Sequence, residues 1–271
     1  MANLKMFCLT MNPSHEELIK KINYIPVGLG NKKFGTSVLN DKQGLNISEK
    51  NPYYGEYTFH YNLWKNNTIE TDKWIGFCQY RKFWRKTEVE FDKNNFNEFN
   101  NSILKEIDKD INSYDAIIGQ DFFVNQFRFS KFMKHNFKKM ILNPNLFFFK
   151  SKRNILFHFD MMHGDGNLEK AINLLDLKER EGFKKFVNNE VAFNPHNMFI
   201  CKNKEILFSY YDSVFPWLRR CEEVFGFENL NTYGLKRIYG FLAERYLSYW
   251  FKKYTKYKTL PILFKDLSEF L

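Results

Sequence analysis

The sequence has no long uncharged hydrophobic run, and this absence argues against a membrane-spanning helix. Such a helix needs about 20 apolar residues, and no run in this chain approaches that length. Residues 1–11 also lack the basic start and the long apolar stretch of a secretion signal. We therefore expect a folded protein that stays in the cytoplasm.

Cysteine is scarce, and its spacing excludes a zinc knuckle. The chain has 4 cysteines, none of them in a C-x-x-C pair, and the gaps between them are too wide for such a site. Cys8, Cys78 and Cys201 lie inside apolar runs that are typical of buried strands. We predict reduced thiols in the core.

Two ligand-binding signatures are also missing. The G-L-G at residues 28–30 is followed by Lys33 where a dinucleotide-binding fingerprint needs glycine. The D-K-D at residues 108–110 would have to close a buried strand to bind a metal. Isoleucines at positions 103, 107 and 111 instead predict a helix with this D-K-D on its solvent face. No metal site is predicted there.

Acidic residues are outnumbered, and aromatic residues are abundant. The 41 lysines and arginines against 31 aspartates and glutamates give a net charge of +10, and 19% of the chain is aromatic. This combination is typical of nucleic-acid-binding proteins, although AT-rich coding DNA would produce the same bias. No RRM aromatic box or zinc finger supports that function. The charge by itself favours an anionic partner such as a nucleotide, a phosphosugar or an acidic membrane surface.

Apolar runs alternate with amphipathic segments, which predicts an α/β sheet covered by helices. Strands are expected at residues 4–10, 74–78, 116–119 and 194–201, and helices at residues 14–22, 54–66, 96–112, 203–225 and 234–254. Ser14 and Glu17 are spaced as a capping box for the first helix, and Asn203 is expected to cap a later one.

Connecting segments and domain organisation are less strongly patterned. Residues 27–51 are expected to form a long loop at the sheet edge. No repeat or convincing linker divides the chain. We predict a single domain over residues 1–271, with the irregular residues 121–150 as a lid or an insertion on the acceptor side.

Basic residues follow the buried run at residues 74–78. Arg81, Lys82 and Arg85 would lie at the carboxyl edge of the sheet, where open α/β sheets bind ligands. Guanidinium groups can grip phosphate oxygens through a planar fork. A phosphate site is predicted here, and the alternative is a solvated strand end.

Several motifs, in the same order, resemble a bacterial family of unknown function that is labelled capsular or exopolysaccharide glycosyltransferase. The motifs are N-I-S-E-K-N at residues 46–51, Y-G-E-Y-T-F-H-Y-N-L-W-K-N at 54–66, W-I-G-F-C-Q-Y-R-K-F at 74–83, Y-I-P-V-G at 24–28, N-M-F-I at 197–200 and R-I-Y-G-F-L-A-E-R at 237–245. The sequence departs from the family at two positions. Gly55 stands where the family has Cys, and Gln79 where it has His, so no titratable imidazole is present at residue 79.

The family is similar to GT-A glycosyltransferases, and the resemblance implies a mixed, mainly parallel sheet flanked by helices. By this resemblance Glu56 takes the place of the donor-sugar carboxylate, with a solvent-facing helix charge as the alternative. Residues 79–81 take the place of a metal-binding D-x-D. Arg81 with Lys82 or Arg85 would then stabilise the diphosphate leaving group without a metal ion.

The implied activity is a hexosyltransferase with no metal or other cofactor. It would move a hexose of galactose or galactofuranose type from a UDP-linked sugar to a growing capsular, exopolysaccharide or lipopolysaccharide glycan. The acceptor would be a glycan or a lipid-linked glycan, and the lysines and aromatic residues at 250–258 suggest peripheral contact with an anionic inner membrane. The alternative is a basic, aromatic-rich nucleic-acid-binding protein.

The predicted site residues fall into three groups. The catalytic candidates are Glu244, Asp160 and His163, the donor and phosphate group is Thr10, Glu56, Gln79, Tyr80, Arg81, Lys82, Arg85 and Arg245, and the acceptor group is His196 and Asn197.

Each catalytic candidate has an alternative. Glu244 lies on an apolar helical stretch beside Arg245, so it is either half of a structural ion pair or an active-site acid. His163 is an acceptor contact or an ordinary surface histidine, and Asp160 is the reserve general base. The spacing of His158, Asp160 and His163 does not favour a metal site.

Overall fold

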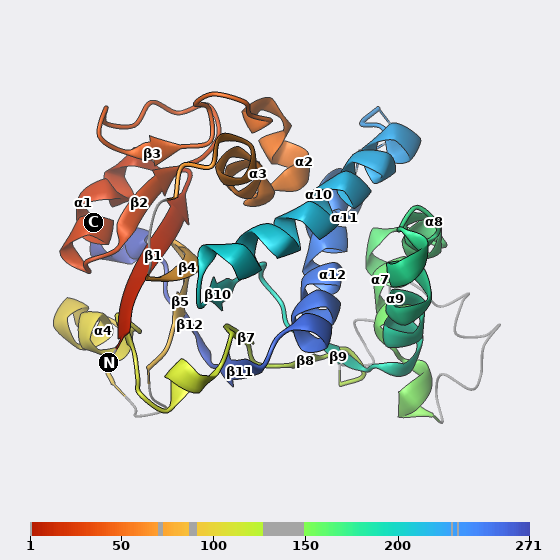
Figure 1. The fold of residues 1–271 in the computed structure, drawn as a ribbon. Coiled ribbons are helices and arrows are strands. Elements are labelled where there is room, and N and C mark those ends of the chain that lie inside the picture. Colours follow the sequence, from red (N-terminus) through yellow and green to blue (C-terminus); the bar gives the residue numbers. More distant parts are fainter. Residues whose placement is uncertain (1, 70–72, 87–90, 127–148, 229, 232) are drawn as a thin grey trace. The chain divides into compact units, whose positions relative to one another are not determined.

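The computed structural model describes residues 2–69, 73–86, 91–126, 149–228, 230–231 and 233–271, which form two compact units (Figure 1). Unit 1 comprises Met1–Gln120, His196–Ser213 and Trp250–Leu271, and unit 2 comprises Asp121–Pro195 and Val214–Tyr249. The helices α10 (Lys204–Phe225) and α12 (Ile238–Tyr254) contribute residues to both. The single-domain organisation stays a prediction, and most of the expected lid at 121–150 lies outside the described residues.

Unit 1 is built on a mixed sheet whose central path has the order β11-β7-β10-β4-β1-β2-β3. Its strands are β1 (Ala2–Thr10), β2 (Ile25–Gly28), β3 (Leu39–Asn40), β4 (Trp74–Gln79), β7 (Ala116–Gly119), β10 (Phe199–Cys201) and β11 (Tyr257–Leu260). Along this path β10 is antiparallel to both neighbours, and the other pairs are parallel. The predicted mainly parallel α/β sheet is therefore confirmed. The strands β5 (Lys82–Trp84), β6 (Glu106–Ile107) and β12 (Ile262–Phe264) pair off the path.

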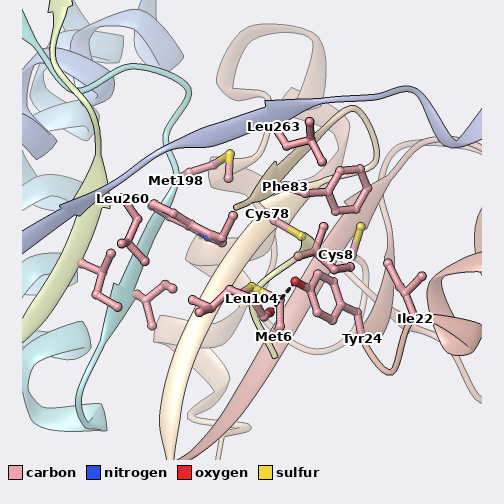
Figure 2. Packing of buried hydrophobic residues seen from close by; sticks show 14 of the residues in the cluster. Met6, Cys8, Ile22, Tyr24, Cys78, Phe83, Leu104, Met198, Leu260 and Leu263 are labelled. Carbon is pink, nitrogen blue, oxygen red and sulfur yellow. Dashed lines mark hydrogen bonds between the residues drawn. The ribbon is translucent and has the colours of Figure 1, made fainter. Parts of the chain in front are cut away.

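Helices cover both faces of this sheet because its central strands are apolar on both sides. The helical segments that lie wholly in unit 1 are η1 (Pro13–His15), α1 (Glu16–Lys21), η2 (Ser48–Lys50), α2 (Asn51–Tyr54), α3 (Tyr57–Asn66), α4 (Phe96–Ser102), η3 (Ile111–Ser113) and η5 (Leu267–Phe270). On one face Met6 and Cys8 pack in a cluster with Ile19 of α1 and Phe99 of α4. Figure 2 shows part of this cluster around Met6, Cys8 and Tyr24.

The opposite face is packed with aromatic rings. The Phe7 ring lies 6.0 Å from Phe59 of α3, and the Phe199 ring lies 5.5 Å from Tyr210 of α10 and 5.2 Å from Phe251 of α12. The aromatic residues of unit 1 thus fill its core. All four cysteines are free and buried, which confirms the prediction of reduced core thiols.

Unit 2 consists of helices and a short two-stranded ribbon. Its elements are β8 (Phe122–Phe123), η4 (Lys150–Lys152), α7 (Ile155–His163), α8 (Asn167–Asn173), α9 (Leu177–Asn189), β9 (Ala192–Phe193), α11 (Tyr233–Lys236) and parts of α10 and α12. Trp217 lies at its centre, where its indole Nε1 donates to Ala171 O at 2.7 Å. The Tyr246 and Phe183 rings lie 5.0 and 5.8 Å from Trp217.

The expected helix at 96–112 is wrong. The helix α4 ends at Ser102, Ile107 lies in β6 beside the start of β1, and Ile111 begins a short 3-10 turn. Each isoleucine is buried for a separate reason, so their spacing of four imitates a helix. Asp110, in a surface turn, pairs with Lys258 at 3.0 Å.

Other expected boundaries also differ. Asn12 rather than Ser14 caps the first helical turn, because Pro13 begins a 3-10 helix directly after it. Glycine 55 separates α2 from α3. The strand β10 begins only at Phe199, since residues 194–198 are a loop and turn between β9 and β10. The capping role of Asn203 is confirmed, because its Oδ1 accepts from Ile206 N at 3.0 Å. Within the described residues, no helix has the length and apolar character needed to cross a bilayer.

The buried Tyr24 hydroxyl should contribute measurably to the stability of unit 1. It donates to Leu104 O at 2.5 Å in the cluster of Figure 2. Tyr24→Phe leaves this carbonyl without that donor, so we expect the free energy of unfolding to fall by about 1–2 kcal/mol in urea denaturation. Tyr254→Phe, at a ring that is 47% exposed, is the control and should change little. An unchanged urea midpoint for Tyr24→Phe would contradict this role.

Candidate functional site

The carboxyl ends of three parallel strands meet at one edge of the unit 1 sheet. Leu9 in β1 is in register with Gln79 in β4, and Thr10 is in register with Gly28 in β2. Ligands of open α/β sheets bind outside the carboxyl ends of the strands. The structure therefore brings Thr10 and Gln79 to an edge that is suited to a ligand.

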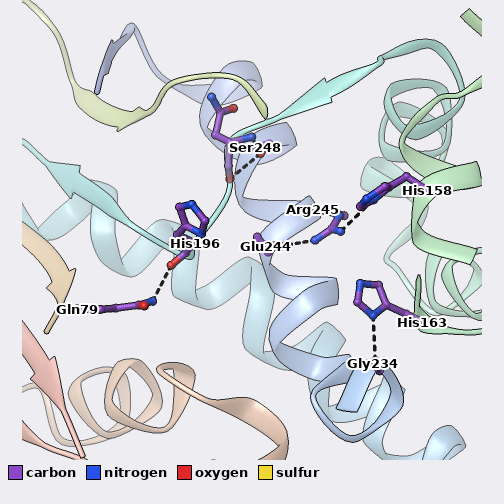
Figure 3. Close-up of polar contacts among 9 residues, drawn as sticks. Gln79, His158, His163, His196, Gly234, Glu244, Arg245 and Ser248 are labelled. Atoms are coloured by element: carbon purple, nitrogen blue, oxygen red, sulfur yellow. Dashed lines mark hydrogen bonds and ion pairs between the residues drawn. The ribbon is translucent and has the colours of Figure 1, made fainter. Parts of the chain in front are cut away.

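Gln79 connects three segments that are far apart in the sequence. Its Nε2 donates to Glu56 Oε1 at 2.6 Å. The same nitrogen donates to His196 O at 2.9 Å (Figure 3). Glu56 immediately precedes α3, and His196 precedes β10. Because β10 runs antiparallel to β4, the residues before β10 lie at the carboxyl end of β4.

The backbone at His196 and Asn197 has an unusual conformation. Their φ values are 81° and 54°, in the left-handed region that residues other than glycine seldom adopt. Such conformations cost of order 1–3 kcal/mol each and cluster at functional sites. The strained turn places the His196 carbonyl on Gln79, and so brings the two predicted acceptor residues to the same edge as Glu56.

Positive charge borders this contact. Arg81 is exposed in the two-residue turn between β4 and β5, and its guanidinium carbon lies 4.9 Å from the Tyr80 ring centre. Burial, with a smaller effect of the nearby Lys82, lowers the pKa of His196 to about 3. At neutral pH the edge therefore combines a neutral imidazole with the cations of Arg81 and Lys82.

Arg85 does not reach this edge, contrary to the prediction. The strand β5 pairs antiparallel with β4, so the chain turns back after Lys82. Arg85 forms an isolated bridge with Ile103, and its guanidinium lies 5.5 Å from the Phe91 ring. At about 3.3 Å per strand residue, Arg85 is carried roughly 10 Å back from the turn.

Thr10 is at the edge but faces inward. It is 1% exposed, and its Oγ1 lies 2.8 Å from His15 Nδ1. The other ring nitrogen of His15 lies 2.8 Å from Ser268 Oγ, and burial lowers the pKa of this histidine. The Thr10 hydroxyl thus anchors the loop after β1 rather than a phosphate. His15 was missed in the sequence because its partner Ser268 lies 253 residues away.

Arg245 is buried in unit 2. It is 1% exposed and forms an ion pair with Glu244 (Figure 3). Its guanidinium carbon lies 3.9 Å from the Phe193 ring centre. The Arg245 Nη2 also lies 3.4 Å from His158 Nδ1. Of the two alternatives for Glu244, the ion pair is present. The predicted phosphate contact of Arg245 is not supported, because its guanidinium is buried and already paired with Glu244.

His163 is buried as well, so the alternative of a surface histidine is wrong. It is 4% exposed, and its ring lies 4.0 Å from the Phe241 ring. Its Nδ1 donates to Gly234 O at 2.9 Å. Burial, with a smaller effect of Arg245, lowers the pKa of His163 to about 2, which makes it a weak base at neutral pH.

The predicted residues are thus divided between the units. Glu244, Arg245, Asp160 and His163 belong to unit 2, and the remaining donor and acceptor residues belong to unit 1. Asp160 is half-buried on α7 between His158 and His163. Across the described part of the chain, no three His, Cys, Asp or Glu side chains are grouped so that they could hold a metal ion.

A protein-family model described as a domain of unknown function, DUF4422, matches residues 8–256. The chain belongs to the DUF4422 family. The matched residues contain every predicted site residue and the motifs at 24–28, 46–51, 54–66, 74–83, 197–200 and 237–245. No curated protein matches the chain.

Among solved structures, this DUF4422 protein is similar to the apo structure of the bifunctional glycosyltransferase WbbM. The TM-score is 0.65 at 20% sequence identity, and the similarity covers 97% of this chain and 45% of that one. The chain thus has a fold found in a glycosyltransferase, and it spans less than half of WbbM.

Buried neutral histidines should make unit 2 sensitive to acid. The unfolded chain binds a proton at His163 below pH about 6.5, whereas the folded protein does not until about pH 2. The stabilisation is therefore complete above pH 6.5 and is lost as the pH falls, by up to ~1.4 kcal/mol per pH unit.

The variant His163→Gln keeps an N–H donor for Gly234 but does not titrate. In urea titrations the free energy of unfolding of this variant should fall less steeply between pH 6 and 4 than that of the wild type. We expect the two slopes to differ by ~1 kcal/mol per pH unit. Met162→Gln, at a 54% exposed neighbour on α7, should keep the wild-type slope. Equal slopes for wild type and His163→Gln would show that His163 is not held neutral.

Proposed function

We propose that the protein is a glycosyltransferase that moves a hexose from a nucleotide diphosphate sugar to a glycan. The observation that carries the proposal is the contact of Glu56, Gln79 and His196 at the carboxyl edge, bordered by Arg81 and Lys82. The glycosyltransferase-like fold supports it, and so does the resemblance of the motifs around these residues to a family labelled glycosyltransferase.

In this proposal the cations bind the diphosphate. The exposed Arg81 can present its planar fork to phosphate oxygens, and Lys82, the first residue of β5, adds a second charge beside it. Negative charge grows on the leaving diphosphate as the glycosidic bond breaks, and positive groups at that point lower the barrier. Arg81 and Lys82 then do the work of a metal ion, and transfer is metal-independent.

Glu56 and the strained turn would contact the sugars. The half-buried Glu56 carboxylate can accept hydrogen bonds from donor-sugar hydroxyls, while Gln79 holds its orientation. His196 and Asn197 are assigned to the acceptor side. Asp160 stays the reserve prediction for a general base, whereas Glu244 is paired with Arg245 and the His163 pKa is about 2.

The finer specificity belongs to the same proposal. We infer a UDP-linked donor of galactose or galactofuranose type and an acceptor glycan of a capsule, exopolysaccharide or lipopolysaccharide. The motif resemblance supports this assignment.

A basic surface supports peripheral contact with an anionic membrane. Exposed Lys253 and Lys256 flank the 47% exposed Tyr254 where α12 gives way to β11. The Lys256 and Lys258 amines lie 5.0 and 5.8 Å from the Tyr114 ring centre. Lysines near an anionic leaflet gain about 1 kcal/mol each, and tyrosine favours the headgroup level.

A nucleotide diphosphate should stabilise the protein without a metal. In EDTA, UDP at about 100 times its Kd should add about 2.7 kcal/mol to the free energy of unfolding, seen as a raised Tm. Arg81→Ala should weaken UDP binding in calorimetry at least about tenfold, because a charge-assisted bond is lost. Arg219→Ala, at an exposed α10 arginine paired with Glu223, is the matched control.

The absence of a Tm shift with every nucleotide diphosphate tested would overturn the transferase proposal. A shift that needs added Mn²⁺ would keep the transferase and remove its metal independence.

Vesicle binding should depend on four lysines in the last turn of α12 and in the segment that follows it. Replacing Lys252, Lys253, Lys256 and Lys258 with Ser should weaken co-sedimentation with anionic vesicles at least about tenfold at low salt. Lys258 should contribute least because it pairs with Asp110. The control replaces the exposed lysines of α8 and α9, Lys170, Lys178, Lys184 and Lys185, and so removes the same charge. An equal loss of co-sedimentation in the two variants would mean that only net charge matters. Docking would be refuted if the wild type itself failed to bind anionic vesicles.

A further inference from the structure

A buried carboxyl group lies next to the helix that follows Glu56. Asp41 comes directly after β3, and it is 0% exposed. Its Oδ2 accepts a hydrogen bond from Thr58 Oγ1 at 2.5 Å. Burial raises the pKa of Asp41, while the Thr58 hydroxyl and the backbone amides of Asp41 and Gly30 favour its charged form. Burying such a group costs free energy unless it is bonded, so Asp41 requires an explanation.

Thr58 connects Asp41 to the turn that carries Glu56. Asn51 Nδ2 donates to Gly55 O at 3.0 Å and to Thr58 Oγ1 at 3.2 Å. Thr58 Oγ1 also lies 3.1 Å from Gly55 O. A hydroxyl has one hydrogen, and the shorter contact with Asp41 takes it when the carboxyl is charged. Buried side chains thus hold the Gly55 peptide from one side.

The peptide that they hold has a backbone conformation that requires support. Gly55 has φ 58° and ψ −130°, a combination that residues with a side chain rarely adopt. Glycine also loses more conformational freedom on folding than any other residue. Because Glu56 follows directly, the direction of its side chain toward Gln79 depends on how firmly this turn is held.

We propose that Asp41 is a positioning residue for Glu56, acting through Thr58 and Asn51 on the Gly55 turn. The inference rests on the proposed function, in which Glu56 contacts the donor sugar. Asp41 touches no substrate and acts only through the network. A displacement of about 1 Å in a reacting group can cost ~100-fold in rate, so a buried support can matter for turnover.

Hydrogen exchange tests the support without any substrate. The amides of Thr58 and Phe59 bond to Gly55 O and Glu56 O at 3.2 and 3.1 Å. Asp41→Ala should speed their exchange at least about tenfold, and Asp41→Asn, which keeps an acceptor oxygen, less than about threefold.

The matched control for exchange is Asp212→Ala. Asp212 Oδ1 accepts from Trp64 Nε1 at 2.7 Å near the far end of α3. This variant therefore loses a bond to the same helix but none to the Gly55 turn, and it should leave the Thr58 and Phe59 amides unchanged.

Kinetics test whether the support serves Glu56. With UDP-galactose as the donor and water as the acceptor of galactose, Asp41→Ala should lower kcat for UDP release at least about tenfold, while the Kd of UDP stays within about twofold. Asp41→Asn should recover most of kcat. Asp41→Ala combined with Glu56→Gln should be no slower than Glu56→Gln alone, because both changes act on one group.

The two proposals fail in different ways. Unchanged Thr58 and Phe59 exchange in Asp41→Ala, or additive effects with Glu56→Gln, would overturn the positioning role. The proposed function in this form would be overturned if Glu56→Gln kept the wild-type kcat, or if the wild type released no UDP. Hydrogen exchange would then still show whether Asp41 supports the Gly55 turn. If Asp41→Ala does not fold, Thr58→Val against Thr58→Ser takes its place in both experiments.

Discussion

The parallel pairing of β1 with β4 is the constraint on which the candidate site depends. Phe7 faces Phe77, and Leu9 faces Gln79, in strands that are buried on both faces. A slip of one residue would send every side chain to the opposite face of the sheet, against different neighbours. The register is therefore strongly specified, and with it the points where the strands end. Gln79 is the first polar residue after the apolar part of β4, and its amide emerges at the edge.

The neutral and the charged groups at that edge differ in their exposure to solvent. The neutral groups, the Gln79 amide and the His196 imidazole, lie in the partly buried interior of the site. Burial keeps the imidazole uncharged, with a pKa of about 3. Arg81 stays in an exposed turn, where a charge keeps its hydration until a ligand replaces it. The arrangement combines a preorganised neutral contact with the exposed cation of Arg81.

Local patterns in the sequence indicated which residues are buried, but not which structural element buries them. The runs that became β1, β4 and β7 were recognisable because strands covered on both faces are almost continuously apolar. The isoleucines at 103, 107 and 111 are equally buried, yet they lie in a bridge, a strand and a 3-10 turn. Arg245 matched a family motif, but its guanidinium is enclosed by aromatic rings and Glu244.

What the sequence by itself determined was the α/β class, the main strands, the reduced cysteines and the Glu56 and Gln79 motifs. Only the tertiary structure decided which of these residues meet. The bond of Gln79 to the His196 carbonyl depends on the antiparallel insertion of β10 beside β4. The pairing of His15 with Ser268 joins residues 253 positions apart, and Asp41 reaches Thr58 from a loop without periodicity. Periodicity reports only whether a residue is buried, whereas the order of strands in the sheet sets its partners.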